Sequence, residues 1–135
     1  MIELVVKHHF SAGHRIPGLP GAGAKCSNLH GHTFGVSWAF AVEGLDASEF
    51  EFAECKKLLR RWVDENLDHG YLVAPDDHGL ISYLEAEGHK LYVIAPVPTT
   101  EAIAVELLGA ASQLIRVPCI EVCVTEGPHN EARVR

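Results

Sequence analysis

The strongest constraint on the fold is a pair of long alternating segments that follow each other with no helix between them. From Ile2 to Phe10 apolar side chains alternate with polar ones, and from about His32 to Glu43 large apolar residues alternate with small ones. This period-two pattern is typical of strands with one buried face. The intervening stretch IPGLPGAGAK is rich in glycine and proline, so we expect no regular structure there. Two strands joined in this way favour antiparallel pairing and an α+β domain.

The rest of the chain supplies helices and two more strands. Apolar residues at three- and four-residue spacing predict an amphipathic helix within residues 48–67. A second long helix is expected after Thr99, its predicted N-cap, with a short helix over residues 81–87. Residues 90–95 and 119–126 complete a four-stranded sheet. Because such a sheet has two unpaired edges, we expect subunits to associate into a homo-oligomer.

Composition limits the class of protein. The 135 residues predict one domain spanning 1–135, and the formal net charge of -7 argues against nucleic-acid binding, which needs a basic surface. No apolar run is long enough to cross a membrane, and we read no signal peptide at the start. Two of the four cysteines, Cys119 and Cys123, would lie too far apart in one strand to form a disulfide. We therefore expect reduced thiols and a cytoplasmic protein.

The segment CSNLHGHTF carries the most specific chemical signal. His30 and His32 stand two apart at the start of a predicted strand, so both imidazoles point to the same face. His14 follows the first strand and supplies a third imidazole if the two strands pair. Three histidines are a ligand set for Zn²⁺ that leaves one coordination position open, as in catalytic zinc sites. The sequence therefore predicts a zinc site at these residues.

Cys26 lies four residues before His30 and has two interpretations. As a fourth ligand it would close the site and make the zinc structural. As a free thiol beside a metal ion and next to Lys25, it would be held toward the reactive thiolate form. The spacing is compatible with both interpretations.

Two further positions are candidates for chemistry. Asp68 and His69 adjoin each other at the end of a predicted helix, where a carboxylate can orient an imidazole for proton transfer. Glu126 ends the last predicted strand, where its carboxylate could accept two hydrogen bonds from a guanidine-like ligand edge. Each of these arrangements also occurs without any chemical role.

Taken together, the segments FSAGH, CSNLHGH, FAECK, LDHGYL, PTTE and TEGP resemble the 6-pyruvoyltetrahydropterin synthase family, which includes the 6-carboxytetrahydropterin synthases. The resemblance implies an antiparallel sheet with two helices on one face. It also implies trimers whose sheets join into a barrel, the tunnelling fold, with two trimers stacked into a hexamer. His14, His30 and His32 match the zinc ligands, Cys26, Asp68 and His69 the catalytic set, and Glu126 the pterin anchor. Thr99, Thr100 and Glu101 match a segment near the pterin pocket.

The resemblance implies a lyase reaction on 7,8-dihydroneopterin triphosphate. The leading hypothesis is formation of 6-carboxy-5,6,7,8-tetrahydropterin with loss of acetaldehyde and triphosphate, as in queuosine synthesis. An alternative is the pyruvoyl-forming reaction, which releases triphosphate only. A third possibility of another class is a non-catalytic, zinc-stabilised pterin-binding protein. Arg15, Lys7 and Lys25 are the nearby cations for the triphosphate.

Four residues depart from the family pattern. They are Glu51, Val73, Gly127 and Val134. None of them is a candidate metal ligand or the candidate thiol, but they leave the exact substrate and product open.

Overall fold

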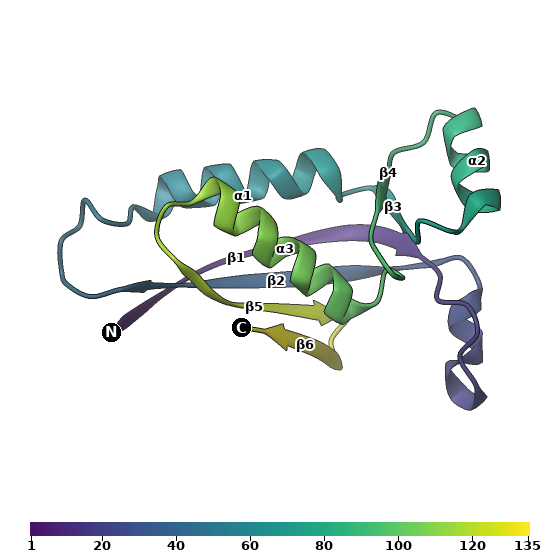
Figure 1. The fold of residues 1–135 in the computed structure, drawn as a ribbon, viewed down its shortest axis with the longest axis horizontal. Helices are drawn as coiled ribbons and strands as arrows, with labels where there is room; N and C mark the ends of the chain where they lie inside the picture. Colours follow the sequence, from purple (N-terminus) through teal and green to yellow (C-terminus); the bar gives the residue numbers. More distant parts are fainter.

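A computed structural model describes all residues, 1–135, as a sheet covered on one face by two long helices (Figure 1). The elements in chain order are β1 (Ile2–His14), the 3₁₀ helix η1 (Gly21–Ser27), β2 (His30–Val42), α1 (Phe52–Asn66), β3 (Gly70–Val73), α2 (His78–Ala86), β4 (Leu91–Val93), α3 (Thr100–Leu114), β5 (Cys119–Glu126) and β6 (Asn130–Val134). None of the helices combines the length and apolar character of a membrane span.

The sheet has six strands in the order β4-β3-β1-β2-β5-β6. The prediction of antiparallel pairing between the first two strands is confirmed, and β5 and β6 continue the antiparallel pattern. The prediction of four strands was wrong, because β3 and β6 were not expected. β3 is only four residues long, and the β6 sequence NEARV has no apolar run. β3 and β4 also lie parallel to their neighbours, so the sheet is mixed.

Several boundaries differ from the sequence prediction for local reasons. β1 continues to His14, four residues past the expected end, since its pairing with β2 continues through this position. The glycine-rich stretch was expected to lack regular structure, but part of it forms η1. Short i→i+3 bonds, such as Gly23 N–H to Pro20 O at 3.2 Å, make such a turn available to this sequence. α1 begins at Phe52 because the Glu51 side chain caps it.

The core lies between α1, α3 and the sheet. Even-numbered residues of β1 and β2 face the helices, and among them Phe34, Trp38 and Phe40 are almost fully buried. Val63 of α1 and Leu107 of α3 are fully buried against the same cluster. Figure 1 shows both helices on one face of the sheet, with α2 at the end of the sheet where β1 finishes. Since that end also carries His14 and His30, the candidate site lies there.

Candidate metal centre and neighbouring groups

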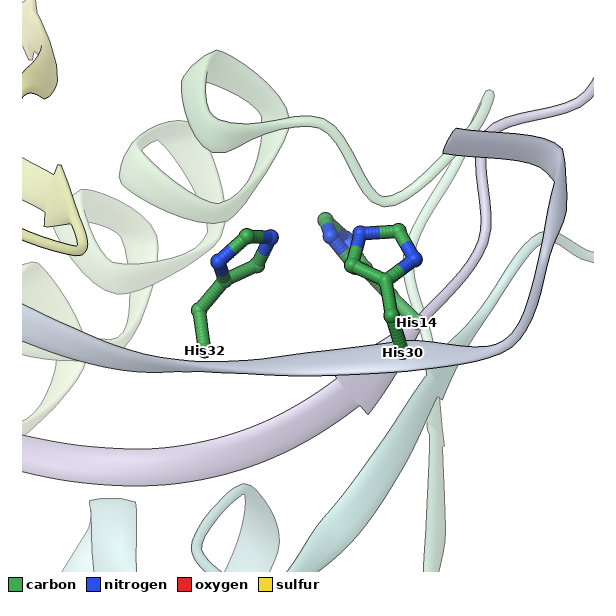
Figure 2. Close-up of side chains that lie close together, drawn as sticks. All are labelled: His14, His30 and His32. Atoms are coloured by element: carbon green, nitrogen blue, oxygen red, sulfur yellow. The ribbon is translucent and has the colours of Figure 1, made fainter. Parts of the chain in front are cut away.

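Three histidines converge at the end of the β1–β2 pair. His14 is paired with His30 across the two strands, and His32 stands opposite Ala12. All three occupy even positions, so their side chains rise from the face that the helices cover. The ring centroids lie 4.7 to 5.2 Å apart, and one nitrogen from each ring falls within 4.8 Å of the others (Figure 2). The predicted grouping of these histidines is confirmed.

Backbone carbonyls fix the orientation of two of the rings. His14 Nδ1 lies 2.8 Å from the carbonyl oxygen of Pro98, and His30 Nδ1 lies 2.7 Å from that of Asn28. A carbonyl only accepts hydrogen bonds, so each Nδ1 is the protonated nitrogen and donates. Each Nε2 therefore keeps its lone pair for a metal ion. Such hydrogen bonds from the second ring nitrogen are typical of histidines that bind metals.

The third ring shows that the group fits a metal ion. His32 Nε2 is buried and has no hydrogen-bond partner. Glu126 Oε1 lies 3.4 Å away, which is too long for a good hydrogen bond. A buried polar atom without a partner is costly, and a cation shared by the three rings would remove that cost. Burial is also the main reason that the pKa of His14 is lowered, which favours the neutral form that binds metals.

Cys26 lies on η1, beside the histidine cluster in sequence but outside the set of converging ligand atoms. Its carbonyl accepts a 2.7 Å hydrogen bond from Ile16 N–H, which ties η1 to the segment that follows His14. The residue is partly exposed and its thiol is free. Cys26 is thus a partly exposed free thiol on the segment between the strands that carry the three histidines.

Asp68 and His69 form a hydrogen-bonded pair on the turn between α1 and β3. His69 Nδ1 lies 2.7 Å from Asp68 Oδ2, and Ser11 N–H donates to Asp68 Oδ1 at 2.9 Å. Burial alone would raise the pKa of Asp68, but the bonds from Ser11 and His69 outweigh it and lower that pKa. The carboxylate is therefore ionised at neutral pH and can orient the imidazole.

His69 does not join the metal cluster within one subunit. Its side chain is 83% exposed and lines an open hollow whose other lining residues include Ser11, Gly31, Thr33 and also His32. Ser11, Gly31 and Thr33 occupy odd positions, which alternate with the positions of the three histidines along β1 and β2. His69 therefore shares a hollow with His32 at this end of the sheet, but its ring nitrogens are not among the converging ligand atoms.

Glu126 lies next to the cluster and is oriented by α3. Thr100 Oγ1 donates to Glu126 Oε2 at 2.5 Å, while Oε1 faces His32. Thr99 caps α3 by accepting a hydrogen bond from Ala102 N–H at 3.3 Å, as predicted. Glu101 is exposed in the first turn of α3 and makes no contact with the cluster in this structure. The structure therefore brings Glu126 and Thr100 together with the histidines, but not Glu101.

Some contacts at this end of the sheet were not predictable from local sequence. The carbonyls of Asn28 and Pro98 orient ligands through backbone atoms, so no residue type marks them. Arg15, a candidate for binding phosphate, instead donates two hydrogen bonds to Asp77 at 2.8 and 2.6 Å. Lys7 lies on the opposite face of the sheet from the histidines, in a hollow lined by β1, β2, β5 and β6. Neither cation is therefore positioned beside the cluster as a free charge.

Comparison with known proteins identifies the family. A sequence model described as 6-pyruvoyl tetrahydropterin synthase matches residues 3–135. The chain belongs to the 6-pyruvoyl tetrahydropterin synthase family. It is 34% identical over 110 residues to a protein of Rickettsia felis named 6-carboxy-5,6,7,8-tetrahydropterin synthase, covering 79% of this chain and 78% of that one. A protein of Bacillus subtilis with the same name is 34% identical over 133 residues, covering 93% and 80%.

Solved structures show the same fold. An uncharacterized protein of Wolinella succinogenes superposes with a TM-score of 0.84 at 23% identity, covering 98% of this chain and 97% of that one. The 6-pyruvoyl tetrahydropterin synthase of Caenorhabditis elegans superposes with a TM-score of 0.70 at 21% identity, covering 99% and 94%. Membership of this family, together with the names of these relatives, identifies the chain as an enzyme of the carboxy- or pyruvoyl-tetrahydropterin synthase type, which is a lyase.

Proposed function

We propose that this chain is a zinc-dependent lyase of the carboxytetrahydropterin branch. Its substrate would be 7,8-dihydroneopterin triphosphate, and its products 6-carboxy-5,6,7,8-tetrahydropterin, acetaldehyde and triphosphate, in the pathway to queuosine and other 7-deazapurines. The names of the relatives at 34% identity support this choice of product. The observation that carries the proposal is the convergence of His14, His30 and His32, with His32 Nε2 buried and unpartnered.

We assign zinc to this group because of its ligands. Three neutral imidazoles suit Zn²⁺, and they leave a coordination position for substrate. When bound, the zinc would supply Lewis acidity toward the hydroxyl groups of the substrate side chain. The carbonyls of Asn28 and Pro98 hold the rings of His30 and His14 with Nε2 available, so the ligands need little reorganisation.

The remaining residues have separate roles in the proposal. The Cys26 thiolate removes a proton from the substrate side chain, and the Asp68–His69 pair returns one. The Glu126 carboxylate, oriented by Thr100, accepts hydrogen bonds from the amino-pyrimidine edge of the pterin. Thr99 fixes the first turn of α3 and so the position of Thr100. Glu101 has no contact that supports a role, and we keep it only as a residue that flanks the pocket.

We also propose that the enzyme is a cytoplasmic homo-oligomer, a trimer or hexamer whose sheets join into a barrel. The outer edge of β1 pairs with β3 only at Ala12 and Gly13, and β6 is an edge strand, so both have unpaired backbone groups. The four free cysteines agree with a reducing compartment.

The product decides between the two branches. Zinc-loaded protein is incubated with 7,8-dihydroneopterin triphosphate, and the products are identified by mass spectrometry. Acetaldehyde with a carboxylated pterin supports the proposal. A pyruvoyl product would favour the alternative, for which the description of the matching family is the argument.

The Cys26→Ala variant separates an enzyme from a zinc-stabilised binding protein. If Cys26 is a free catalytic thiol, the variant keeps its zinc and its melting temperature but loses turnover. If Cys26 closes a structural site, the variant loses metal affinity and thermal stability together. Because the Cys26 thiol lies outside the converging ligand atoms, we expect the first result.

A further inference from the structure

Lys90 is distant from α1 in sequence, but its side chain contacts backbone carbonyls at the end of this helix. It directly precedes β4, and its carbonyl accepts a 3.0 Å hydrogen bond from Tyr71 N–H, which anchors its backbone beside β3. Its Nζ donates to the carbonyl oxygens of Asp64 and Asp68, both at 2.6 Å. The ammonium group thus joins two carbonyls at the C-terminus of the helix.

The sequence of α1 explains why a cation is needed there. The last carbonyls of a helix have no partner within the helix, and its C-terminus carries a partial negative charge. The last turn contains Asp64 and Glu65, which are unfavourable in that field, and no basic residue. Arg61 of α1 pairs with Glu65 at 3.0 Å, but the carbonyls of Asp64 and Asp68 receive their donor, and a nearby positive charge, from Lys90.

The turn that Lys90 contacts is the one that carries Asp68 and His69. The amides of Leu67 and Asp68 both donate to Val63 O, and His69 then adopts a φ of 59°, a left-handed conformation that a non-glycine residue adopts at a cost. On its other side the turn is held by Ser11, whose N–H donates to Asp68 and whose carbonyl accepts from His69 N–H at 2.7 Å. Ser11, on β1, and Lys90, next to β4, therefore both hold the turn by hydrogen bonds.

We propose that Lys90 is a positioning residue for the Asp68–His69 pair. It acts through the backbone carbonyl of Asp68, and it keeps the left-handed turn in the conformation that aims the His69 imidazole. This inference rests on the proposed function, in which the pair returns a proton to the substrate. Removing the ammonium leaves two carbonyls without their donor, so the turn relaxes and His69 samples other orientations.

The kinetic test compares Lys90→Met with Lys57→Met, a control at an exposed lysine of α1. We expect Lys90→Met to lower kcat by about tenfold with KM changed less than about twofold, because positioning affects the proton transfer rather than substrate binding. Lys57→Met should match the wild type. Lys90→Arg, which can still donate to two carbonyls, should recover most of the loss.

A double-mutant cycle tests whether Lys90 acts through the pair. In a His69→Ala background, Lys90→Met should have no further effect on kcat, because the group that it positions is already absent. An equal loss of kcat in both backgrounds would overturn the proposal, since it would mean a general effect on folding. An unchanged kcat in Lys90→Met alone would overturn it as well.

Amide hydrogen exchange tests the same proposal without activity. The His69 N–H, bonded to Ser11 O, should exchange at least about tenfold faster in Lys90→Met than in the wild type, while amides in the middle of α1 keep their protection. Unchanged exchange at His69 would overturn the positioning role. If instead the wild type fails to turn over substrate, or His69→Ala keeps full activity, the proposed function fails, and the exchange result still decides the role of Lys90.

Discussion

The bond between Thr100 and Glu126 allows a quantitative test of the proposed pterin anchor. Thr100→Val keeps the shape of the side chain but removes the hydroxyl that donates to Glu126 Oε2 at 2.5 Å. A hydrogen bond to a charged group contributes about 1.5–3 kcal/mol, and we take the lower end because water reaches the Glu126 side chain, which is 20% exposed. Fixing a freed glutamate side chain costs up to about 2 kcal/mol, a similar amount. At 1.4 kcal/mol per factor of ten, pterin binding should weaken roughly tenfold.

The assay is steady-state kinetics on zinc-loaded protein with 7,8-dihydroneopterin triphosphate. We expect KM to rise about tenfold in Thr100→Val with kcat changed less than about threefold, the result for a contact that binds ground state and transition state alike. Ser112→Ala is the matched control, since it removes a hydroxyl from the same helix that bonds only to Leu108 O. Glu126→Gln, which removes the charge of the proposed anchor itself, should raise KM more than Thr100→Val does. If Glu126→Gln weakens binding strongly while Thr100→Val leaves KM within twofold, the reasoning about Thr100 is refuted.

Two further substitutions test the metal site and the ion pair between Arg15 and Asp77. In His32→Ala we expect the zinc content, measured by plasma mass spectrometry, to fall to a small fraction of the wild-type value. The control His78→Ala, at an exposed residue, should keep its zinc. Full retention of zinc by His32→Ala would contradict the ligand assignment. Asp77→Asn should lower the free energy of unfolding at pH 7 by about 1–2 kcal/mol, because the Asp77 carboxylate accepts two hydrogen bonds from Arg15 in a partly exposed site. The Arg15 bonds lower the pKa of Asp77 below its ordinary 3.8, so this contribution is present above that pH and is lost as the pH falls through the lowered pKa. Urea denaturation at fixed protein concentration should show the difference closing in acid, and a difference that persists there would argue against the ion pair.

The parts of the fold that were predictable have strong local patterns. Alternation predicted β1 and β2, helical spacing predicted α1, and Thr99 predicted the start of α3. β3 and β6 were missed because strands of four and five residues without a long apolar run carry little periodic signal. Their places in the sheet depend on tertiary pairing, which a local pattern does not encode.

The departures from the family pattern have structural explanations in two cases. Gly127 follows Glu126 at a φ of 61°, a conformation that suits glycine in the tight turn between β5 and β6. Glu51 caps α1 by accepting hydrogen bonds from Ala53 and Glu54 N–H at 3.0 and 2.7 Å. Val73 is buried in β3, and Val134 pairs with Val122 at the sheet edge. These substitutions are compatible with the fold and leave the choice of product to experiment.

The candidate site was predictable where its residue types and their spacing in the sequence are typical of a known kind of functional site. Two histidines that stand two residues apart on a strand point to the same face of the sheet, so the sequence predicted that the side chains of His30 and His32 share a face. The contact of Thr100 with Glu126 joins positions 26 residues apart, and that of Lys90 with Asp68 joins positions 22 apart. Such contacts exist only once the chain has folded. The catalytic roles of Cys26, Asp68 and His69 stay predictions.

X-ray absorption at the zinc edge of the purified protein tests the central claim most directly. The proposed site requires imidazole nitrogens at about 2.0–2.1 Å and a fourth light-atom ligand, with no sulfur in the first coordination sphere. We predict three imidazoles per zinc and an unchanged spectrum in Cys26→Ala. A zinc–sulfur distance of about 2.3 Å that disappears in Cys26→Ala would contradict the account, because the thiol would then be a ligand and the open position would be lost.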